Sequence, residues 1–282
     1  MLYKIYVSCA TDSTYLKTIA VMIYSLMRHT SNPIELYVMY SECDIKVLNN
    51  LKKLFPNLEL IFLEINKLKF KKFKKFKKSN RINEITYYRL LLCDLLPPFI
   101  SKIIYLDGDL ILRKDILNLW EINLHNKIIG AIPDIGPYTR YVSSSKALTL
   151  YKKLKIPEYS MYFNAGVLLI DVELWKAKKI KEKIESYLLK NRDYQDGLNA
   201  ILWNNWYRID YSWNAISDIF DNPDFCLKEL GENKYQKVIS DPYIVHFTGR
   251  IKPWLKECRH IYRQEYQECM DNVIKIIDDF AE

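Results

Sequence analysis

The sequence predicts an α/β fold with a mostly parallel central sheet and a helical segment at the C-terminal end. Short apolar runs rich in β-branched residues alternate with longer segments whose apolar residues recur every three or four positions, as expected for strands followed by helices. Proline and asparagine separate several of these runs. The chain has 282 residues, of which 49% are hydrophobic and 27% charged, and this composition suits a compact globular enzyme.

The first half of the chain is expected to form strand, helix, strand units. A strand over residues 5–10 precedes a helix over residues 16–27, in which Ile19, Ile23 and Leu26 recur at helical spacing. The elements expected next are a strand at 34–38, a helix capped by Asp44 and ending at Leu54, a strand at 58–63, a helix at 85–96 stopped by Pro97 and Pro98, and a strand at 103–106. Repeated units of this kind imply parallel strands joined by right-handed crossovers.

The second half contains further apolar runs and amphipathic segments. The expected elements are strands at 127–132, 167–170 and 243–245, helices at 173–189 and 195–203, and a terminal helix from Arg259 onward. Residues 163–166 read as a turn before the second of these strands, and His246 follows the third. Because no internal repeat and no linker is visible, we expect one main domain over residues 1–255 and a helical extension over residues 256–282.

Composition excludes some classes of protein and leaves others open. No apolar run approaches the roughly 20 residues of a membrane span, and no signal-peptide pattern precedes the first strand, so we expect an intracellular protein. A net charge of +8 indicates an anionic ligand, an anionic surface or nucleic acid. The six cysteines lack Cys-x-x-Cys spacing and are expected to pack in reduced form; they are Cys9, Cys43, Cys93, Cys226, Cys258 and Cys269.

The stretch around Asp107-Gly108-Asp109 carries the strongest chemical signal. It follows the apolar strand at 103–106, so both carboxylates are expected at the carboxyl end of that strand, the edge that faces the ligand crevice in open α/β sheets. Two neighbouring carboxylates repel each other unless a cation compensates them, and Gly108 permits a tight turn that aims both at one ion. The alternative interpretation is a solvated acidic loop.

The segment 67–78, which begins with Lys67 and ends with Lys78, has a strongly biased composition. Phe70, Phe73 and Phe76 recur every third residue among lysines, which on a helix gives a narrow aromatic stripe. One interpretation is a basic amphipathic patch that contacts an anionic membrane or an acidic ligand. The other is a solvated helix that packs its phenylalanines onto the domain.

Six short motifs occur in an order that resembles one enzyme family. They are Ala10-Thr11-Asp12, Arg89 on the helix before the acidic strand, Asp107-Gly108-Asp109, the run from Asn164 to Ile170, the run from Gln195 to Asn199, and His246-Phe247-Thr248-Gly249 with Lys252-Pro253-Trp254. In this order they resemble the family-eight retaining glycosyltransferases, which include bacterial lipopolysaccharide galactosyl- and glucosyltransferases and glycogenin. The resemblance runs from about Ile5 to Trp254 and so covers nearly the whole chain.

The resemblance implies a GT-A fold, a nucleotide-binding α/β sandwich, for residues 1–255, with a UDP-sugar donor and Mn²⁺ as the cofactor. It implies that Asp107, Asp109 and His246 bind the metal. Two carboxylates and an imidazole suit a manganese-like ion, with Mg²⁺ as the alternative. The other three histidines are expected to be packed or surface residues.

The resemblance also implies which residues bind the donor: Ala10, Asp12, Thr14, Tyr15, Arg89, Gly108, Gly249 and Lys252. Asp12 would accept a hydrogen bond from the uracil edge, and Lys252 would stabilise the diphosphate leaving group as a point charge. Arg89 would contact the donor sugar and phosphate, although its position alone also fits an ordinary helix-surface charge.

Three residues are expected at the reacting centre: Gln195, Asn164 and Asp134. Gln195 would lie under the anomeric carbon. Because an amide oxygen is a poor nucleophile, we expect same-face attack, in which the departing phosphate oxygen takes the proton of the acceptor. Asn164 and Asp134 would bind sugar hydroxyls, and Asn164 also reads as a turn-forming residue.

The expected activity is therefore that of a metal-dependent retaining hexosyltransferase, which moves glucose or galactose from a UDP-sugar to a glycan, glycolipid or glycoprotein. One alternative is a glycogenin-like enzyme that glucosylates a protein or itself. Another is a nucleotide-sugar-binding module with weakened catalysis, because Thr14 replaces the usual asparagine and Tyr194 a frequent aspartate. A nucleic-acid partner fits the charge but is not expected beside an intact metal motif. We expect a cytoplasmic location, with peripheral contact between the segment 67–78 and the anionic inner face of the membrane.

Overall fold

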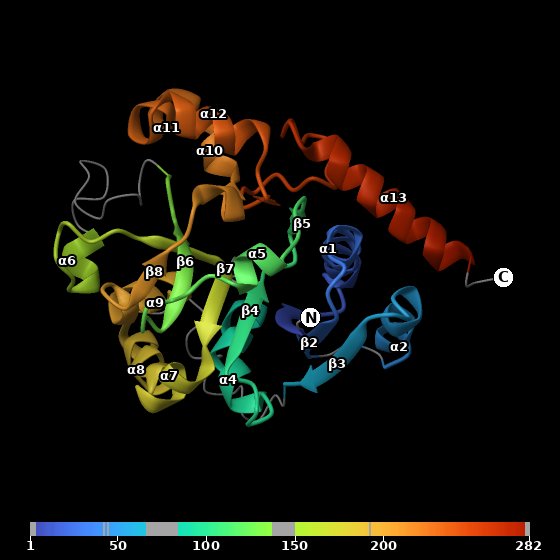
Figure 1. Cartoon of the computed structure of the whole chain (residues 1–282), viewed down its shortest axis with the longest axis horizontal. Coiled ribbons are helices and arrows are strands. Elements are labelled where there is room, and N and C mark those ends of the chain that lie inside the picture. The colour runs from blue at the N-terminus through green and yellow to red at the C-terminus, as the bar shows by residue number, and fades with distance from the viewer. Residues whose placement is uncertain are drawn as a thin grey trace.

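A seven-stranded sheet forms the centre of the protein, which is described by a computed structural model over residues 4–279, with the exception of 42, 44, 66–83, 137–149 and 192. The strand order is β3-β2-β1-β4-β7-β6-β8 (Figure 1). The strands are β1 (Ile5–Thr11), β2 (Ile34–Tyr40), β3 (Glu59–Glu64), β4 (Lys102–Leu106), β6 (Ile129–Pro133), β7 (Phe163–Asp171) and β8 (Trp206–Arg208). Only β7 runs against the direction of the others in this sheet, so the mostly parallel sheet predicted from the sequence is confirmed.

The direction of the strands decides which residues meet at one edge of the sheet. β1 and β4 are parallel, so their carboxyl ends lie at the same edge. β7 is antiparallel to β4, so its amino end reaches that edge too. Residues 107–109 after β4 therefore lie beside Asn164 near the start of β7. This edge is where open α/β sheets bind their ligands.

A second, three-stranded sheet brings a distant part of the chain to the same edge. It consists of β5 (Leu110–Leu112), β10 (Ile244–His246) and β9 (Ala215–Ile216), in that order. His246 pairs with Leu110 in the register of β10 and β5, directly after the acidic motif. Pairing of these two short strands thus places His246 next to Asp109, although 137 residues separate them in the sequence.

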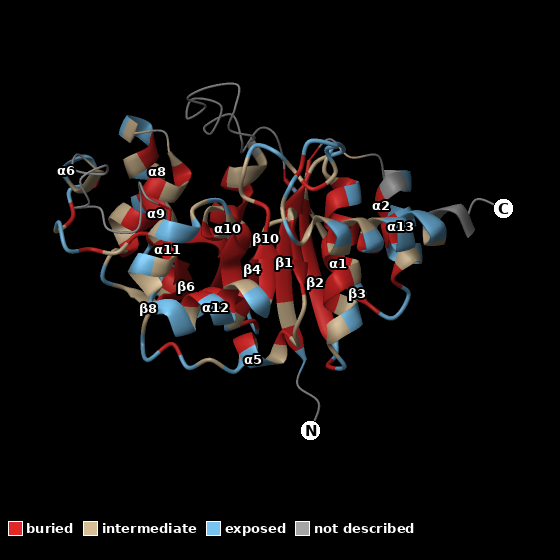
Figure 2. Cartoon of the chain, turned by 90° about the horizontal axis from the view of Figure 1, so that it is seen from above, coloured by how far each residue is buried: buried red, intermediate tan, exposed pale blue. Residues whose placement is uncertain are grey.

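Helices cover both faces of the large sheet. The helices and 3₁₀ helices (η) are α1 (Leu16–His29), α2 (Ile45–Leu54), η1 (Glu84–Leu90), α4 (Leu92–Leu95), α5 (Leu117–Trp120), α6 (Leu150–Leu154), α7 (Val172–Ala177), α8 (Ile180–Asn191), α9 (Tyr194–Leu202), η2 (Tyr211–Asn214), α10 (Ser217–Asp221), α11 (Pro223–Leu230), α12 (Glu232–Ser240) and α13 (Arg263–Asp279). Residues of β4 alternate between two cores: Ile104 and Leu106 join the core under α1 and α13, whereas Ile103 and Tyr105 join the core under α8 and α9. Figure 2 shows buried residues on the central strands and exposed residues on the outer sides of the helices.

Two expected helices differ from the structure. The helix expected at 85–96 is a 3₁₀ helix (η1) followed by the short α4. Residues 87–90 are all buried, whereas four consecutive residues of a surface α-helix point in different directions and cannot all be buried. Nε of Arg89 also donates a hydrogen bond to the backbone carbonyl of Thr86. The helix expected at 173–189 is two helices, α7 and α8, because Lys179 has a φ of 51° and interrupts the helical backbone.

The turn expected at residues 163–166 is also wrong, because these residues belong to β7. The register with β6 jumps there: Ala131 pairs with Leu168, and the next residue, Ile132, pairs with Asn164. The turn-like sequence therefore produces a bulge inside a strand rather than a change of direction.

Smaller differences concern element ends and short elements. The third strand begins at Glu59 rather than at residue 58, and the terminal helix begins at Arg263 rather than Arg259. Nine elements were not predicted from the sequence: β5, β8, β9, α5, α6, η2, α10, α11 and α12. The Asp44 cap and the segment 67–78 lie outside the described residues. The division into residues 1–255 and 256–282 stays a prediction.

Candidate active site

The acidic motif lies directly after β4, at the carboxyl edge of the sheet. The backbone N–H of Asp107 donates to the carbonyl of Gly166 at 2.8 Å, so the pairing of β4 with β7 extends to this residue. Gly108 packs so close to α1 that a β-carbon there would lie 2.9 Å from Cδ1 of Ile19. Gly231 is the only glycine with positive φ among the described residues, so close packing, and not a left-handed turn, explains Gly108.

Asp107, Asp109 and His246 converge as the sequence predicted. Their ligand atoms all lie within 4.8 Å of one another. His246 Nε2 is 3.2 Å from Oδ1 of Asp109 and 3.9 Å from Oδ2 of Asp107. Two carboxylates and one imidazole nitrogen that face a common point form a donor set that fits a divalent cation such as Mn²⁺ or Mg²⁺.

Gly166, inside the bulge of β7, makes this convergence sterically feasible. A β-carbon at this position would lie 2.1 Å from Cε1 of His246 and 2.9 Å from Oδ2 of Asp107. Both distances are shorter than contacts that real β-carbons make. No side chain larger than hydrogen therefore fits between the imidazole and the first carboxylate.

Two basic side chains compensate the charge of the carboxylates. Arg89 Nη2 lies 2.9 Å from Oδ1 of Asp107, and Lys252 Nζ lies 2.5 Å from Oδ2 of Asp109. Burial opposes ionisation of Asp109, but the charge of His246 in its protonated form and that of Lys252 outweigh it and hold the pKa of this carboxyl well below its usual range. The carboxylate of Asp109 is therefore ready to act as an anionic ligand at neutral pH.

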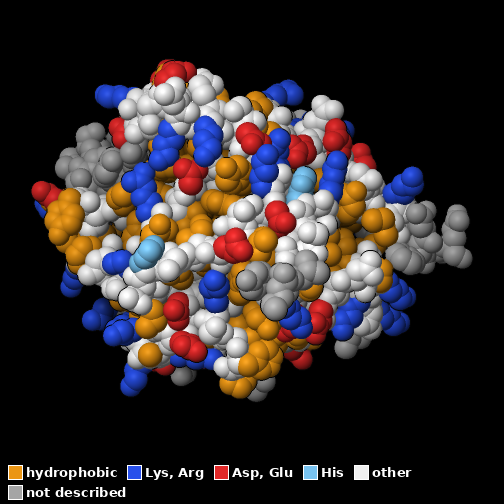
Figure 3. Space-filling model, viewed as in Figure 1, with side chains coloured by type: hydrophobic (Ala, Val, Ile, Leu, Met, Phe, Trp, Pro, Cys, Tyr) orange, Lys and Arg blue, Asp and Glu red, His pale blue; other side chains and the backbone are white. Residues whose placement is uncertain are grey.

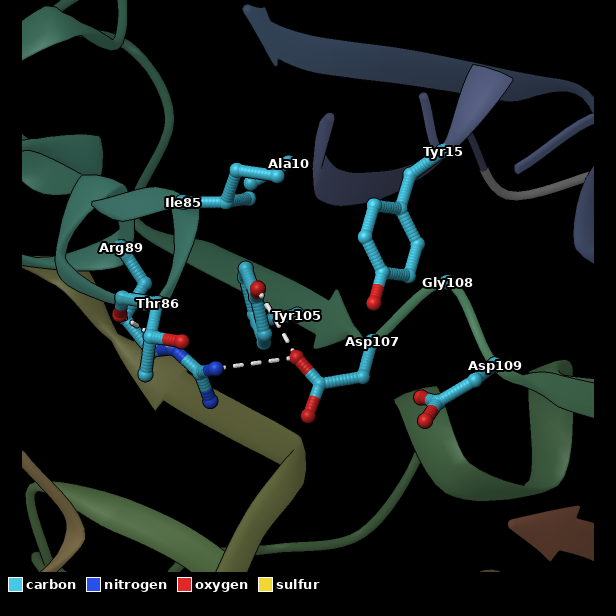
Figure 4. A pocket seen from close by; sticks show the side chains of 9 residues that line it. All are labelled: Ala10, Tyr15, Ile85, Thr86, Arg89, Tyr105, Asp107, Gly108 and Asp109. Carbon is cyan, nitrogen blue, oxygen red and sulfur yellow. Dashed lines mark hydrogen bonds and ion pairs between the residues drawn. The ribbon is translucent and has the colours of Figure 1, made fainter. Parts of the chain in front are cut away.

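Arg89 is fixed as part of the site and is not a surface charge. Only 6% of it is exposed, and it donates to the carbonyl of Ala165 as well as to Asp107. Its guanidinium carbon lies 4.5 Å from the ring centre of Tyr105 and 4.9 Å from that of Tyr194. Figure 4 shows Arg89 and the hydroxyl of Tyr105 meeting the carboxylate of Asp107.

Two adjoining cavities use these residues as walls. The first is lined by Ala10, Tyr15, Ile85, Thr86, Arg89, Tyr105, Asp107, Gly108 and Asp109 (Figure 4). The second shares Thr86, Arg89, Asp107 and Asp109 and adds Asn164, Ala165, Tyr194, Gln195, His246 and Thr248. Asp107 and Asp109 line both cavities and His246 lines the second, so the three candidate ligands lie where the two cavities adjoin.

Of the residues expected at the reacting centre, Gln195 and Asn164 line the second cavity, and Asp134 lies behind Gln195. Gln195 Oε1 accepts a hydrogen bond from the backbone of Ala165 at 3.1 Å, and its Nε2 lies 3.4 Å from Oδ2 of Asp134. Asn164 Oδ1 accepts from the backbone of Gly166 at 2.9 Å. Gln195 and Asn164 thus share the lining of the second cavity with Arg89, and Asp134 supports Gln195.

The residues expected to bind the nucleotide do not all line the same cavity. Ala10 and Tyr15 line the first cavity. Oδ1 of Asp12 accepts hydrogen bonds from Thr14 and from the backbone of Tyr15, so Asp12 and Thr14 fix the turn that leads into α1. Gly249 lines a separate cavity beside Ser217 and Arg250.

Several residues of the site were not predicted from the sequence. Thr86 and Tyr105 line the first cavity, and Trp254 packs edge-on against Tyr15 with ring centres 6.5 Å apart. Asn214, at the end of η2, bonds to Nδ1 of His246. Gly166 and Trp254 stand inside the quoted motifs, whereas Asn214 lies in a segment without any regular pattern.

Comparison of the sequence with known protein families identifies the family of this chain. The model of glycosyl transferase family 8 matches residues 6–258 of the chain. The chain is a family 8 glycosyltransferase. This family 8 glycosyltransferase is 30% identical over 273 residues to General stress protein A of Bacillus subtilis (strain 168), an alignment that covers 92% of the chain and 90% of that protein. It is also 28% identical over 193 residues to the Lipopolysaccharide 1,2-glucosyltransferase of Escherichia coli (strain K12), which covers 66% of the chain and 54% of that protein.

Among solved structures, the galactosyltransferase LgtC in complex with donor and acceptor sugar analogs is similar to this family 8 glycosyltransferase, with a TM-score of 0.79. The match covers 95% of this chain and 96% of that one at 20% identity. This likeness confirms the expected GT-A type α/β fold. The assignment of the chain to glycosyl transfer depends on the family match, since a fold alone does not define a reaction.

Proposed function

We propose that this glycosyltransferase uses Mn²⁺ to move glucose or galactose from a UDP-sugar to a glycan, glycolipid or glycoprotein, with retention of the anomeric configuration. The observation that carries the proposal is the convergence of Asp107, Asp109 and His246 between two cavities. A nucleoside diphosphate-sugar has two parts joined by a diphosphate, and a cation at this boundary would meet the diphosphate.

The metal would be held by the two carboxylates and by Nε2 of His246. When bound, the ion supplies Lewis-acid stabilisation of the charge that develops on the diphosphate as the sugar leaves. The imidazole nitrogen favours Mn²⁺ over Mg²⁺, because Mg²⁺ prefers oxygen ligands alone.

The protein's own cations would do the remaining electrostatic work on the donor. Arg89, which lines both cavities, is held rigidly enough to donate to the donor sugar and the phosphate. Lys252 Nζ, beside Asp109 and the carbonyl of Phe247, would stabilise the leaving diphosphate. In this proposal Tyr15 lies against the base, Ala10 and Gly108 line the donor cleft, and Asp12, Thr14 and Gly249 complete the donor contacts.

At the reacting centre, Gln195 is proposed to orient the sugar and not to attack it. Its amide oxygen already accepts a hydrogen bond from Ala165, and an amide is a poor nucleophile. The acceptor hydroxyl would attack the anomeric carbon on the face that UDP leaves, the bond to the phosphate oxygen would break, and that oxygen would take the acceptor's proton. Asp134 and Asn164 would hold sugar hydroxyls during this step.

The test is a panel of UDP-sugars incubated with the protein and Mn²⁺, with release of UDP measured with and without candidate acceptors. Hydrolysis of UDP-glucose or UDP-galactose that stops on chelation would support the proposal. Tight binding of a UDP-sugar with no release of UDP for any donor would instead favour the binding-module alternative. A glycosyl adduct on the protein itself would favour the glycogenin-like alternative.

The proposed cellular setting is the cytoplasmic face of an anionic membrane, with the segment 67–78 as the contact. No described helix is both long and apolar enough to cross a bilayer. On the face seen in Figure 3, basic and acidic side chains are interspersed, which does not suggest a nucleic-acid-binding patch on that face. Membrane contact and the location stay predictions.

A further inference from the structure

A chain of buried polar side chains lies behind His246. Nδ1 of the imidazole is 2.8 Å from Oδ1 of Asn214, and Nδ2 of Asn214 is 2.9 Å from Oδ1 of Asn164. Oδ1 of Asn164 also accepts from the backbone N–H of Gly166 at 2.9 Å. His246 is 3% exposed, Asn214 1% and Asn164 8%, so water does not compete for these bonds.

The backbone group at the end of this chain fixes the direction of every hydrogen bond in it. An N–H group can only donate, so the atom of Asn164 that faces Gly166 must be the acceptor oxygen. The atom of Asn214 that faces this same oxygen must then be the amide nitrogen. The other end of Asn214 is therefore an oxygen, and Nδ1 of His246 must carry a proton.

The direction of the chain has a consequence for the opposite side of the ring. In the neutral imidazole with its proton on Nδ1, Nε2 presents a lone pair toward Asp109 and Asp107. Three lone-pair donors then face one another without a hydrogen between them, an arrangement that a cation stabilises. In the other tautomer, Nε2–H would donate to Asp109 across the observed 3.2 Å and occupy the place of the cation.

We infer that Asn214 is a positioning residue that selects the metal-binding tautomer of His246, an inference that rests on the metal site of the proposed function. It acts through its amide oxygen, whereas its amide nitrogen holds it against Asn164. Asn214 comes from η2 and His246 from β10, so the selection depends on the docking of these two elements.

The tautomer is read directly from long-range ¹⁵N–¹H correlations of metal-free protein labelled with ¹⁵N-histidine at pH 8. The chain has four histidines, so the spectrum can be assigned by single substitutions. His246 is expected to carry its proton on Nδ1. His260 serves as an internal control with the opposite tautomer, because its Nδ1 accepts from the backbone of Tyr262 at 3.2 Å. A proton on Nε2 of His246 in the wild-type protein would overturn the inference.

Variants then test whether the tautomer matters for the metal, with Mn²⁺ binding measured by electron paramagnetic resonance. Asn214→Leu removes the acceptor and should weaken Mn²⁺ binding by about 10- to 100-fold. Asn214→Asp keeps an acceptor for Nδ1–H but loses the donor to Asn164, so it should keep the Nδ1 proton and bind Mn²⁺ more tightly than Asn214→Leu. Ser212→Ala is the matched control, since it removes a buried hydroxyl of the same 3₁₀ helix that has no hydrogen-bond partner within the described part of the chain.

The outcomes separate this inference from the proposed function. Equal Mn²⁺ affinity of Asn214→Leu and wild type would refute the role of Asn214 while leaving the metal site intact. If Asn214→Leu does not fold, a proton on Nδ1 of His246 in both wild type and Asn214→Asp supports the role, and its absence from either protein refutes it. Failure of the wild-type protein to bind Mn²⁺ would contradict the proposed metal, whereas the spectrum would still report the tautomer.

Discussion

Replacing Gly166 by alanine should damage the metal site without replacing any candidate ligand. The new β-carbon would lie 2.1 Å from Cε1 of His246, 2.8 Å from its Nδ1 and 2.9 Å from Oδ2 of Asp107. Restoring an ordinary contact of 3.4 Å to Cε1 requires a displacement of about 1.3 Å, the difference between 3.4 Å and 2.1 Å. His246 is buried, and Asp107 is half-buried and paired with Arg89, so neither can move this far without separating the ligands.

The magnitude follows from this displacement. A misplacement of about 1 Å in a catalytic site costs on the order of 100-fold in rate, which corresponds to about 2.7 kcal/mol in the activation free energy. Overpacking should also lower the free energy of unfolding by about 1–3 kcal/mol. We therefore expect Gly166→Ala to fold, with a lower melting temperature and about 100-fold slower release of UDP from its UDP-sugar.

The assay compares the stability, UDP release and Mn²⁺ affinity of Gly166→Ala with those of Gly130→Ala. The β-carbon at Gly130 would lie 2.7 Å from Cδ1 of Ile209 and 2.8 Å from Cδ2 of Leu124, neither of which is a candidate ligand, so this control should lose stability but keep its Mn²⁺ affinity. Wild-type Mn²⁺ affinity and wild-type UDP release in Gly166→Ala would refute the claim that His246 and Asp107 must approach across this glycine.

Four further results are expected. Asp109→Asn should abolish UDP release, because it removes one anionic ligand and the ion-pair partner of Lys252. Full activity of this variant in the presence of chelator would contradict the metal assignment. Gln195→Ala should keep part of the activity, and mass spectrometry should find no glycosyl adduct on Gln195 of the wild type; a trapped adduct there would overturn same-face attack. Burial lowers the pKa of His260 from 6.5 to about 4, so between these pH values the unfolded state binds more protons than the folded state. The free energy of unfolding should therefore fall by at most about 3 kcal/mol as the pH drops from 6.5 to 4. This pH dependence should be smaller in His260→Phe, and a melting temperature with the same pH profile in both proteins would contradict the prediction. If the segment 67–78 docks on lipid, Lys→Glu changes at Lys71, Lys72, Lys74 and Lys75 should abolish binding to anionic vesicles while UDP release stays unchanged; unchanged vesicle binding would rule out this contact.

The sequence was most informative about elements whose local residue pattern agrees with the topology of the sheet. The apolar run before Asp107 indicated a buried strand, and the order of strands and helices indicated a mostly parallel sheet, so the position of both carboxylates at its carboxyl edge could be predicted. The approach of His246 could not be derived from periodicity, because it depends on pairing between two strands of three residues each. Only the order of the motifs brought His246 into the prediction.

The sequence was least informative where single contacts decide the structure. The Asn164-Ala165-Gly166 run has the composition of a turn, yet it lies in a strand whose neighbours on β4 and β6 impose a bulge. Asn214 stands in a 3₁₀ helix of four residues, too short to show a period, and its role depends on one hydrogen bond to His246. The sequence alone could not distinguish Arg89 from a surface charge, because its burial depends on contacts with the rings of Tyr105 and Tyr194.

We propose that the site formed by Asp107, Asp109 and His246 binds the ion on which glycosyl transfer depends. The most direct measurement is UDP release from UDP-glucose and UDP-galactose by metal-depleted protein, titrated with Mn²⁺. We predict no release without metal, and a saturable increase whose midpoint equals the Mn²⁺ dissociation constant measured on the same protein by electron paramagnetic resonance. Undiminished UDP release from metal-depleted protein in the presence of excess chelator would contradict the account.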